Sequence, residues 1–254
     1  MKKWLNIGFI CLLASSCTAK KKDLHELALC TNSTYPPYES IGPEGKPIGF
    51  DLDVAEAIAD KLGKKLVIKE FAFDGLILGL EQKKCDFIMA GMSITPAREK
   101  EIAMIPYQGE TTKSYYLLFW KEIPESIKNA KDIAGIWNKT IAVQVATWME
   151  EYLSNIPDIV VKPLEATPEL ILEIKYRKSV ASFVEPHVAT EILAKEPNLK
   201  FIEVPLGKKD WRLGNGIGVK KSNQALTEKI QSAVQELKKE GLIKKFEKRW
   251  FHTQ

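Results

Sequence analysis

The chain has 254 residues, 45% of them hydrophobic, and a formal net charge of +4. This length suits one large domain or two small ones, and the apolar content is sufficient for a buried core. Basic and acidic residues are interspersed, whereas a nucleic-acid-binding protein gathers its basic residues on one face. The stretch "QELKKEGLIKKFEKRW" (235–250) is locally basic, and we interpret it as a solvated helix face. The composition therefore argues against a nucleic-acid-binding protein.

The N-terminal segment is typical of an export signal. A cationic start, "MKK", precedes the apolar run "WLNIGFICLLA" (4–14), which is too short for an ordinary membrane-spanning helix. Small residues then precede Cys17, as in a lipoprotein cleavage site. We expect residues 1–16 to be a signal peptide, Cys17 to carry lipid, and 17–23 to be a tether that holds the protein to a membrane. The alternative is an ordinary cleavage after Ala19.

The segment from residue 26 to residue 92 alternates between strand and helix patterns. Turn-rich sequence follows the first strand, and Asp51 and Asp53 then open a helix that Gly63 can cap. This β-α-β-α-β succession predicts a parallel sheet, and ligands bind such sheets beyond the carboxyl ends of the strands. The predicted strands are 26–32, 65–71 and 85–92, and the predicted helices are 50–65 and 74–84.

Cys30 and Cys85 remain once the exported segment is set aside. Cys30 ends one predicted strand and Cys85 begins another, so parallel pairing would separate them by a strand length. A disulfide tolerates a Cα–Cα distance of only about 7 Å, and we expect two buried free thiols. No spacing such as C-x-x-C or H-x-x-x-H predicts a metal site, and no cofactor is expected.

A second unit begins at residue 112. Its strand patterns are 114–120, 140–145, 159–164 and 180–185, with helices opened by "ATWMEE" (146–151) and at 167–176 and 187–196. A last strand and two helices, within 213–251, return to the first unit. We expect two lobes joined by two crossings, with a cleft between them. The first comprises 24–111 plus 213–254, and the second 112–212.

Several segments, in this order and at these spacings, resemble the periplasmic polar amino-acid-binding proteins of ABC importers, solute-binding protein family 3. They are "STYPPYES" (33–40), "GKPIGFDLDVAEAIADKLG" (45–63), "FAFDGLI" (71–77), "CDFIMAGMSITPAREKEIAM" (85–104), "AVQVATWMEEY" (142–152), "GNGIGV" (214–219) and "LKKEGLIKKFEKRWF" (237–251). "YPPYES" and "AFDGLI" are most similar to the arginine-binding branch.

The resemblance implies a fold and a function. The fold is α/β, the two-lobed periplasmic-binding-protein fold of type II, with a mostly parallel sheet flanked by helices in each lobe. The function is capture of a basic amino acid, above all L-arginine, and delivery to an ABC transporter permease, without enzymatic chemistry. A monomer in the periplasm or cell envelope is implied.

The resemblance also assigns the ligand's α-carboxylate to "GMSITPAR" (91–98). Arg98 matches the family's carboxylate-binding arginine, whose planar guanidinium can give two parallel hydrogen bonds. Ser93 matches a hydroxyl that helps to hold the ligand's α-groups. Ala90 and Gly91 match positions that contribute backbone, although many relatives carry a hydroxyl residue where Gly91 stands.

In the second lobe, the resemblance places Thr147 and Trp148 at a helix start whose free N–H groups can face a carboxylate. The family usually has a Gly-Thr-Thr-like turn there, so Trp148 departs from the pattern and leaves the pocket's shape open. Glu185 stands where relatives bind the α-ammonium with an aspartate.

For the ligand's side chain, the resemblance points to Tyr35 and Phe73 as a flanking aromatic pair, which attracts a guanidinium. Asn32 lies at the polar end of the expected pocket, with Glu39 as counter-charge and Gln144 as an additional contact. Because an amide also serves glutamine, a glutamine, histidine or lysine binder remains an alternative. Two further alternatives are a periplasmic enzyme of the same fold, such as a dehydratase, and a surface-exposed adhesive lipoprotein.

Overall fold

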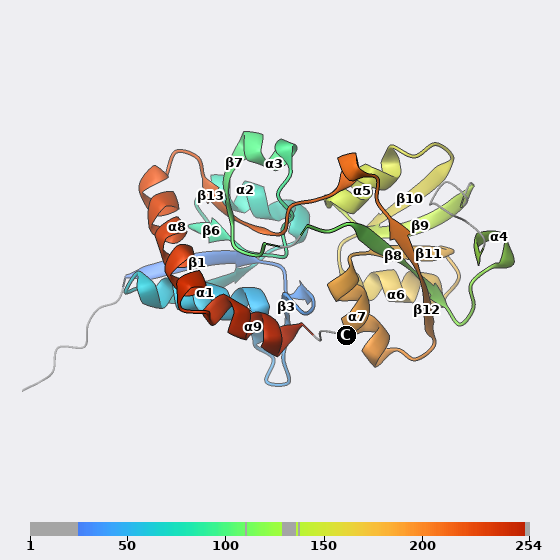
Figure 1. The fold of residues 1–254 in the computed structure, drawn as a ribbon, viewed down its shortest axis with the longest axis horizontal. Coiled ribbons are helices and arrows are strands. Elements are labelled where there is room, and N and C mark those ends of the chain that lie inside the picture. The colour runs from blue at the N-terminus through green and yellow to red at the C-terminus, as the bar shows by residue number, and fades with distance from the viewer. Residues whose placement is uncertain (1–24, 110, 129–135, 137, 252–254) are drawn as a thin grey trace, which may run out of the picture.

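The computed structural model describes residues 25–251, apart from 110, 129–135 and 137. Two α/β lobes lie side by side along the long axis, each built around one five-stranded sheet (Figure 1). The predicted signal peptide, Cys17 and the tether lie outside the described residues. Within the described part of the chain, no helix is both long and apolar enough to cross a membrane.

The first lobe has a sheet in the order β5-β1-β6-β13-β7. Strands β5, β1 and β6 are parallel, and β13 is antiparallel to both of its neighbours. The strands are β1 (Glu26–Thr31), β5 (Lys65–Glu70), β6 (Phe87–Ile88), β7 (Ile102–Pro106) and β13 (Gly216–Lys220). The helices are α1 (Phe50–Lys61), the 3-10 turn η1 (Phe73–Gly75), α2 (Leu76–Glu81), α3 (Pro96–Glu101), α8 (Gln224–Lys239) and α9 (Leu242–Trp250).

Helix α1 follows from its sequence. Its first turn carries Asp51 and Asp53, where acids complement the helix dipole. Gly63, at φ +63°, takes the left-handed conformation just past the end of the helix. The turn-rich segment before α1 holds a small antiparallel sheet that the sequence did not predict, made of β2 (Thr34–Tyr35), β3 (Glu39–Ile41) and β4 (Pro47–Ile48).

The second lobe repeats the first sheet's plan, in the order β10-β9-β11-β8-β12. Three parallel strands are followed by β8, which is antiparallel to β11 and β12. The strands are β8 (Ser114–Trp120), β9 (Lys139–Gln144), β10 (Ile159–Leu164), β11 (Ala181–Val184) and β12 (Leu199–Pro205). The helices are α4 (Glu125–Lys128), α5 (Trp148–Ser154), α6 (Thr167–Lys175), α7 (Pro186–Lys195) and the 3-10 turn η3 (Lys208–Asp210).

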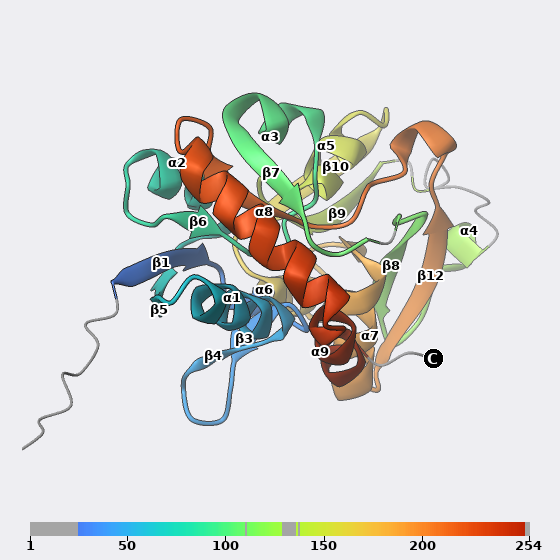
Figure 2. The ribbon, with the colours of Figure 1, turned by 60° about the vertical axis from the view of Figure 1, so that its left-hand side comes forward.

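Two crossings connect the lobes, one from β7 to β8 and one from β12 to β13 (Figure 1). They pair with each other, because the backbone N–H groups of Thr112 and Arg212 donate to each other's carbonyls at 2.9 and 3.2 Å. Helix α8 then crosses the first lobe diagonally, and α9 ends at the junction (Figure 2). There the Phe251 ring lies 4.6 Å from the ring of His187 in the second lobe.

The prediction of two free thiols is wrong, because Cys30 and Cys85 form a disulfide with a Cα–Cα distance of 5.6 Å. The prediction of free thiols placed Cys85 at the start of a strand. Strand β6 in fact starts at Phe87, and Cys85 lies in the connection that follows α2. Both cysteines are buried in one cluster with α2 residues such as Leu80. Cys30 pairs with Ile88 in the register of β1 and β6, and Cys85 lies outside the strand, so the separation along the strands does not apply to it.

Candidate ligand-binding site

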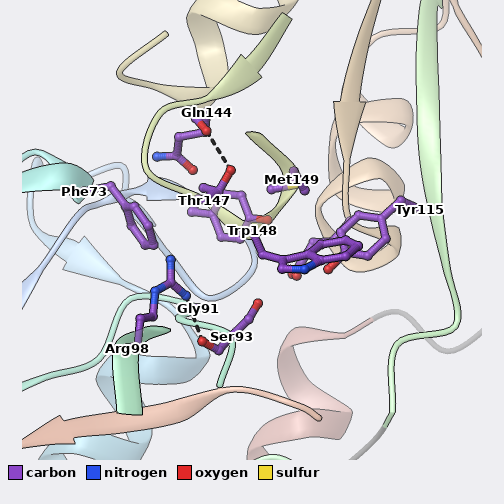
Figure 3. Close-up of a pocket in the computed structure, with 11 residues that line it drawn as sticks. Phe73, Gly91, Ser93, Arg98, Tyr115, Gln144, Thr147, Trp148 and Met149 are labelled. Atoms are coloured by element: carbon purple, nitrogen blue, oxygen red, sulfur yellow. Dashed lines mark hydrogen bonds between the residues drawn. The ribbon is translucent and has the colours of Figure 1, made fainter. Parts of the chain in front are cut away.

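A small pocket lies between the lobes, and its cavity volume, counted as the space open to the centre of a water-sized sphere, is about 10 Å³. This is close to the space that one water molecule needs, so the two lobes pack closely around the site. Its lining comes from both lobes: Tyr35, Phe73, Gly91, Ser93, Arg98, Tyr115, Gln144, Thr147, Trp148, Met149 and Glu185 (Figure 3). The position of the pocket suits a small molecule that touches both lobes.

Arg98 is the cation that the first lobe contributes to the lining of the pocket. Thr95 caps the N-terminus of α3 by accepting a hydrogen bond from the Arg98 N–H at 3.3 Å, and Pro96 opens the helix. The guanidinium donates to the Ser93 carbonyl at 2.7 Å and to the Ala146 carbonyl of the second lobe at 3.0 Å. Its carbon lies 5.3 Å from the centre of the Phe73 ring, which it faces in Figure 3. Burial lowers the pKa of Arg98 to about 10, so it remains a cation at neutral pH.

Gly91 shapes the floor of the first lobe. Its φ is +54°, and a Cβ there would lie 2.9 Å from the Tyr35 ring. Its N–H donates to Asp51 at 2.8 Å, and the Tyr107 hydroxyl donates to the same carboxyl at 2.6 Å. The absence of a side chain at Gly91 therefore lets Tyr35 approach, and Asp51 fixes the turn. From the sequence, Asp51 was predicted only to be an acidic residue in the first turn of helix α1.

The second lobe contributes the start of α5. The Thr147 hydroxyl donates to the Gln144 carbonyl at 2.6 Å and accepts from the Glu150 N–H at 3.4 Å. Trp148, the first helical residue, is 5% exposed and packs against Tyr115 with 5.1 Å between ring centroids. Ala146 has φ +58°, a conformation that is unfavourable for a residue with a Cβ. The turn before α5 therefore carries backbone strain next to the pocket.

Glu185 brings the acidic group of the pocket. It precedes α7, is 5% exposed, and has one carboxyl oxygen without a hydrogen-bond partner. Burial raises its pKa to about 8, while hydrogen bonds from Tyr38 and Tyr35 act in the opposite direction. Glu185 is thus a buried acid in the pocket, with one oxygen still able to accept a hydrogen bond.

Three expected residues do not line this pocket. Ala90 is buried directly after β6. Asn32 accepts hydrogen bonds from Thr34 at 2.6 Å and from Gln144 at 3.4 Å, so it lies next to the pocket and contacts the second lobe.

Glu39, the third of them, is fully buried beside Asp51. Both of its carboxyl oxygens lack a protein donor. Burial raises the pKa of Glu39 well above its usual value, with a further rise from Asp51. Burial also raises the pKa of Asp51 itself, to about 6. A proton on Glu39 gives the two acids a hydrogen bond to each other.

The pocket also contains residues that the sequence analysis missed. Tyr115 is the second residue of β8, immediately after the first crossing, and Met149 follows Trp148 in α5. Both read as ordinary core residues, because the patterns of "SYYLLFW" and "ATWMEE" do not show how the lobes meet. Tyr115 lies beside a predicted crossing and Met149 beside a predicted helix start, and these positions were the sequence signals that could have identified them.

Known proteins resemble the chain over most of its length. The family model of bacterial extracellular solute-binding proteins, family 3, matches residues 27–253. The probable ABC transporter arginine-binding protein ArtJ of Chlamydia trachomatis is 37% identical over 255 residues, which cover 98% of this chain and 96% of that protein.

Solved structures are also similar. A mutant of ArgBP from T. maritima is 31% identical, with a TM-score of 0.80 over 89% of this chain and 94% of that one. An ancestral arginine-binding protein bound to glutamine is 32% identical, with a TM-score of 0.79 over 89% and 97% of the two chains.

Proposed function

We propose, because the chain belongs to the bacterial extracellular solute-binding proteins, family 3, that it captures L-arginine between its lobes and delivers it to an ABC transporter permease. It acts by binding, without chemical conversion of the ligand. The relatives ArtJ and ArgBP carry arginine binding in their names, which favours this ligand.

One observation carries the proposal: a buried cation and a buried acid from different lobes line the same small pocket. Arg98 is supplied by the first lobe and Glu185 by the second. An α-amino acid presents the complementary pair, a carboxylate and an ammonium. Charge-assisted hydrogen bonds of this kind are stronger than neutral ones. Ser93 and Thr147 also line the pocket, and they add hydrogen-bonding groups for the same ligand.

The side chain of the ligand is placed by the remaining residues. The faces of Phe73 and Tyr35 suit a flat guanidinium, which stacks on aromatic rings better than a compact ammonium does. The Gln144 amide lines this end of the pocket and can supply an oxygen acceptor, and Asn32 lies next to it. Amides also suit a glutamine side chain, and one similar structure is an ancestral arginine-binding protein bound to glutamine, so glutamine is included among the ligands to be tested.

Further parts of the proposal concern location and motion. The N-terminal sequence supports export and lipid attachment at Cys17, which would tether the protein in the periplasm. The monomeric state is a further part of the proposal and rests on the family resemblance. Because the binding groups are divided between two lobes, closure around the ligand is the functional motion, as is usual for such proteins. Small-angle scattering of ligand-stripped protein should show a smaller radius of gyration after arginine is added.

Competition binding tests the ligand. Purified, ligand-stripped protein is loaded with labelled arginine and challenged with unlabelled arginine, lysine, ornithine, histidine or glutamine. We expect arginine to displace the label at the lowest concentration and glutamine at the highest. Displacement by glutamine at a lower concentration than arginine would overturn the ligand assignment, and retention of no amino acid would overturn the function.

A further inference from the structure

Trp148 forms a wall of the pocket, and neighbouring rings hold its indole. The ring centroids of Tyr115 and Tyr152 lie 5.1 and 4.9 Å from it. Aromatic pairs at this spacing stabilise each other beyond the burial of their surface area. The position of the wall is therefore set by what packs against the indole, and one of these neighbours is not aromatic.

That neighbour is Arg212, whose guanidinium carbon lies 4.4 Å from the centre of the Trp148 ring. This is the shortest of the cation–ring distances found in the described part of the chain, the others being 5.1 to 5.3 Å. Its Nη1 donates to the neighbouring Trp211 carbonyl at 3.1 Å, and its Nε is buried without a partner. The guanidinium is thus directed at the indole even though one N–H stays unpaired.

Arg212 also belongs to the connection between the lobes. Its backbone pairs with Thr112 in both directions, and this pair joins the two crossings. Arg212 does not itself line the pocket. It therefore connects the paired crossings to a wall of the pocket through one cation–π contact.

We propose that Arg212 is a positioning residue that holds the Trp148 indole in place as the pocket wall and links that wall to the paired crossings. The planar guanidinium can lie flat on the indole, which a lysine ammonium cannot do in the same way. Its effect on arginine affinity rests on the proposed function. Its effect on the indole does not.

The test follows Trp148 directly. The chain has six tryptophans, so the full protein is labelled with 5-fluorotryptophan and the Trp148 resonance is assigned from the Trp148→Phe variant. In Arg212→Met, which keeps an extended side chain without the charge, we expect the fluorine resonance of Trp148 to shift and broaden. Arginine affinity should fall about 2- to 30-fold, the range that corresponds to a cation–π contact. Arg212→Lys should give intermediate values for both, and it serves as the readout if Arg212→Met does not fold.

Lys113→Met is the matched control. Lys113 lies beside Thr112 in the same crossing, and its ammonium lies 5.1 Å from the centre of the Trp211 ring, a cation–π contact that does not reach the pocket. This variant should leave the Trp148 resonance and the arginine affinity unchanged.

An unmoved Trp148 resonance in Arg212→Met, or in Arg212→Lys if that is the variant that folds, would overturn the proposal. Equal effects of Lys113→Met on Trp148 would do the same. If the wild type binds no amino acid but the resonance still shifts, the proposed function fails while the positioning role of Arg212 stands.

Discussion

The two lobes complete the pocket in different ways. In the first lobe, hydrogen bonds within the lobe fix the binding groups: Arg98 donates to the Ser93 carbonyl, and the Gly91 N–H donates to Asp51. In the second lobe, Trp148 is held by ring packing, and Glu185 keeps an oxygen without a partner. The first lobe therefore holds its side of the pocket partly with hydrogen bonds of its own, although Arg98 also donates to the Ala146 carbonyl of the second lobe, whereas Glu185 presents an oxygen that a ligand can complete.

The difference extends to the backbone. Beside the pocket, the first lobe has a glycine, Gly91, in the left-handed conformation. The corresponding left-handed residue of the second lobe, just before α5, is Ala146. Glycine adopts this conformation without a steric penalty, and alanine does not. Under the proposed function, recognition of the carboxylate would rest on an unstrained turn. The shape of the pocket would rest on a strained turn and on Trp148, which departs from the sequence expected from the family resemblance.

The largest effect is expected from Arg98→Ala. Removing one partner of a buried charge pair typically costs about 3–5 kcal/mol, which corresponds to a loss of roughly 100-fold or more in affinity. Calorimetric titration with arginine measures this loss. Arg249→Ala is the matched control, because Arg249 is 66% exposed and forms an ion pair with Asp53 on the surface. Arginine affinity within threefold of wild type in Arg98→Ala would contradict the role of the first lobe.

Glu185, in the second lobe, should make the arginine affinity depend on pH. The pKa of Glu185 is raised to about 8, while the ligand's ammonium requires the ionised carboxylate. Binding below pH 8 must therefore release a proton, and arginine affinity should rise about tenfold per pH unit between pH 6 and 8. Titrations in buffers with different ionisation enthalpies count the released proton. Glu185→Gln should bind more weakly and lose most of this dependence, and a flat profile in the wild type would contradict the assignment.

The same buried acids predict how the ligand-free protein responds to pH. Burial raises the pKa of Glu185 from 4.5 to about 8 and that of Asp51 from 3.8 to about 6. Between these values the folded state holds protons that the unfolded state has lost, so the free energy of unfolding should fall as pH rises from about 4 to 8. The unfolding temperature of Glu185→Gln should fall less steeply with pH across this range than that of the wild type.

A smaller effect is expected from Ala146→Gly. A left-handed alanine costs roughly 1–2 kcal/mol, and the added chain entropy of glycine offsets about 0.5–1 kcal/mol. The free energy of unfolding should therefore rise by up to about 1.5 kcal/mol. Asn138→Gly is the control, because Asn138 has φ +55° but asparagine tolerates this conformation better. An equal or larger gain in Asn138→Gly, measured by denaturant unfolding, would argue against strain at Ala146.

The smallest effect on binding is expected from Glu39→Gln. Its carboxyl faces Asp51 rather than the pocket, and its raised pKa favours the neutral form. A neutral amide of the same shape should leave arginine affinity within about threefold of wild type. A loss comparable to that of Arg98→Ala would instead restore Glu39 as the counter-charge of the ligand.

The sequence predicted the long elements well, because their periodicity is strong. Strands β8 and β10 have the expected bounds, and α1 begins at the expected residue. The two-residue strand β2 directly precedes Pro36, β4 begins at Pro47 and precedes Gly49, and neither is long enough to carry a periodic signal. The disulfide was missed because Cys85 lies in the connection before β6 and not in a strand. Within the site, motif positions such as Arg98 and Ser93 were predictable, whereas Tyr115 and Arg212 depend on how the lobes meet.

The most direct test of the account is calorimetric titration of the wild type with three ligands: L-arginine, agmatine, which lacks the carboxylate, and N-acetylarginine, which lacks the ammonium. If one amino acid bridges Arg98 and Glu185, each analogue leaves one buried charge unpaired, and both should bind at least about 100-fold more weakly than arginine. Agmatine or N-acetylarginine binding within threefold of arginine would contradict the bridge between the lobes.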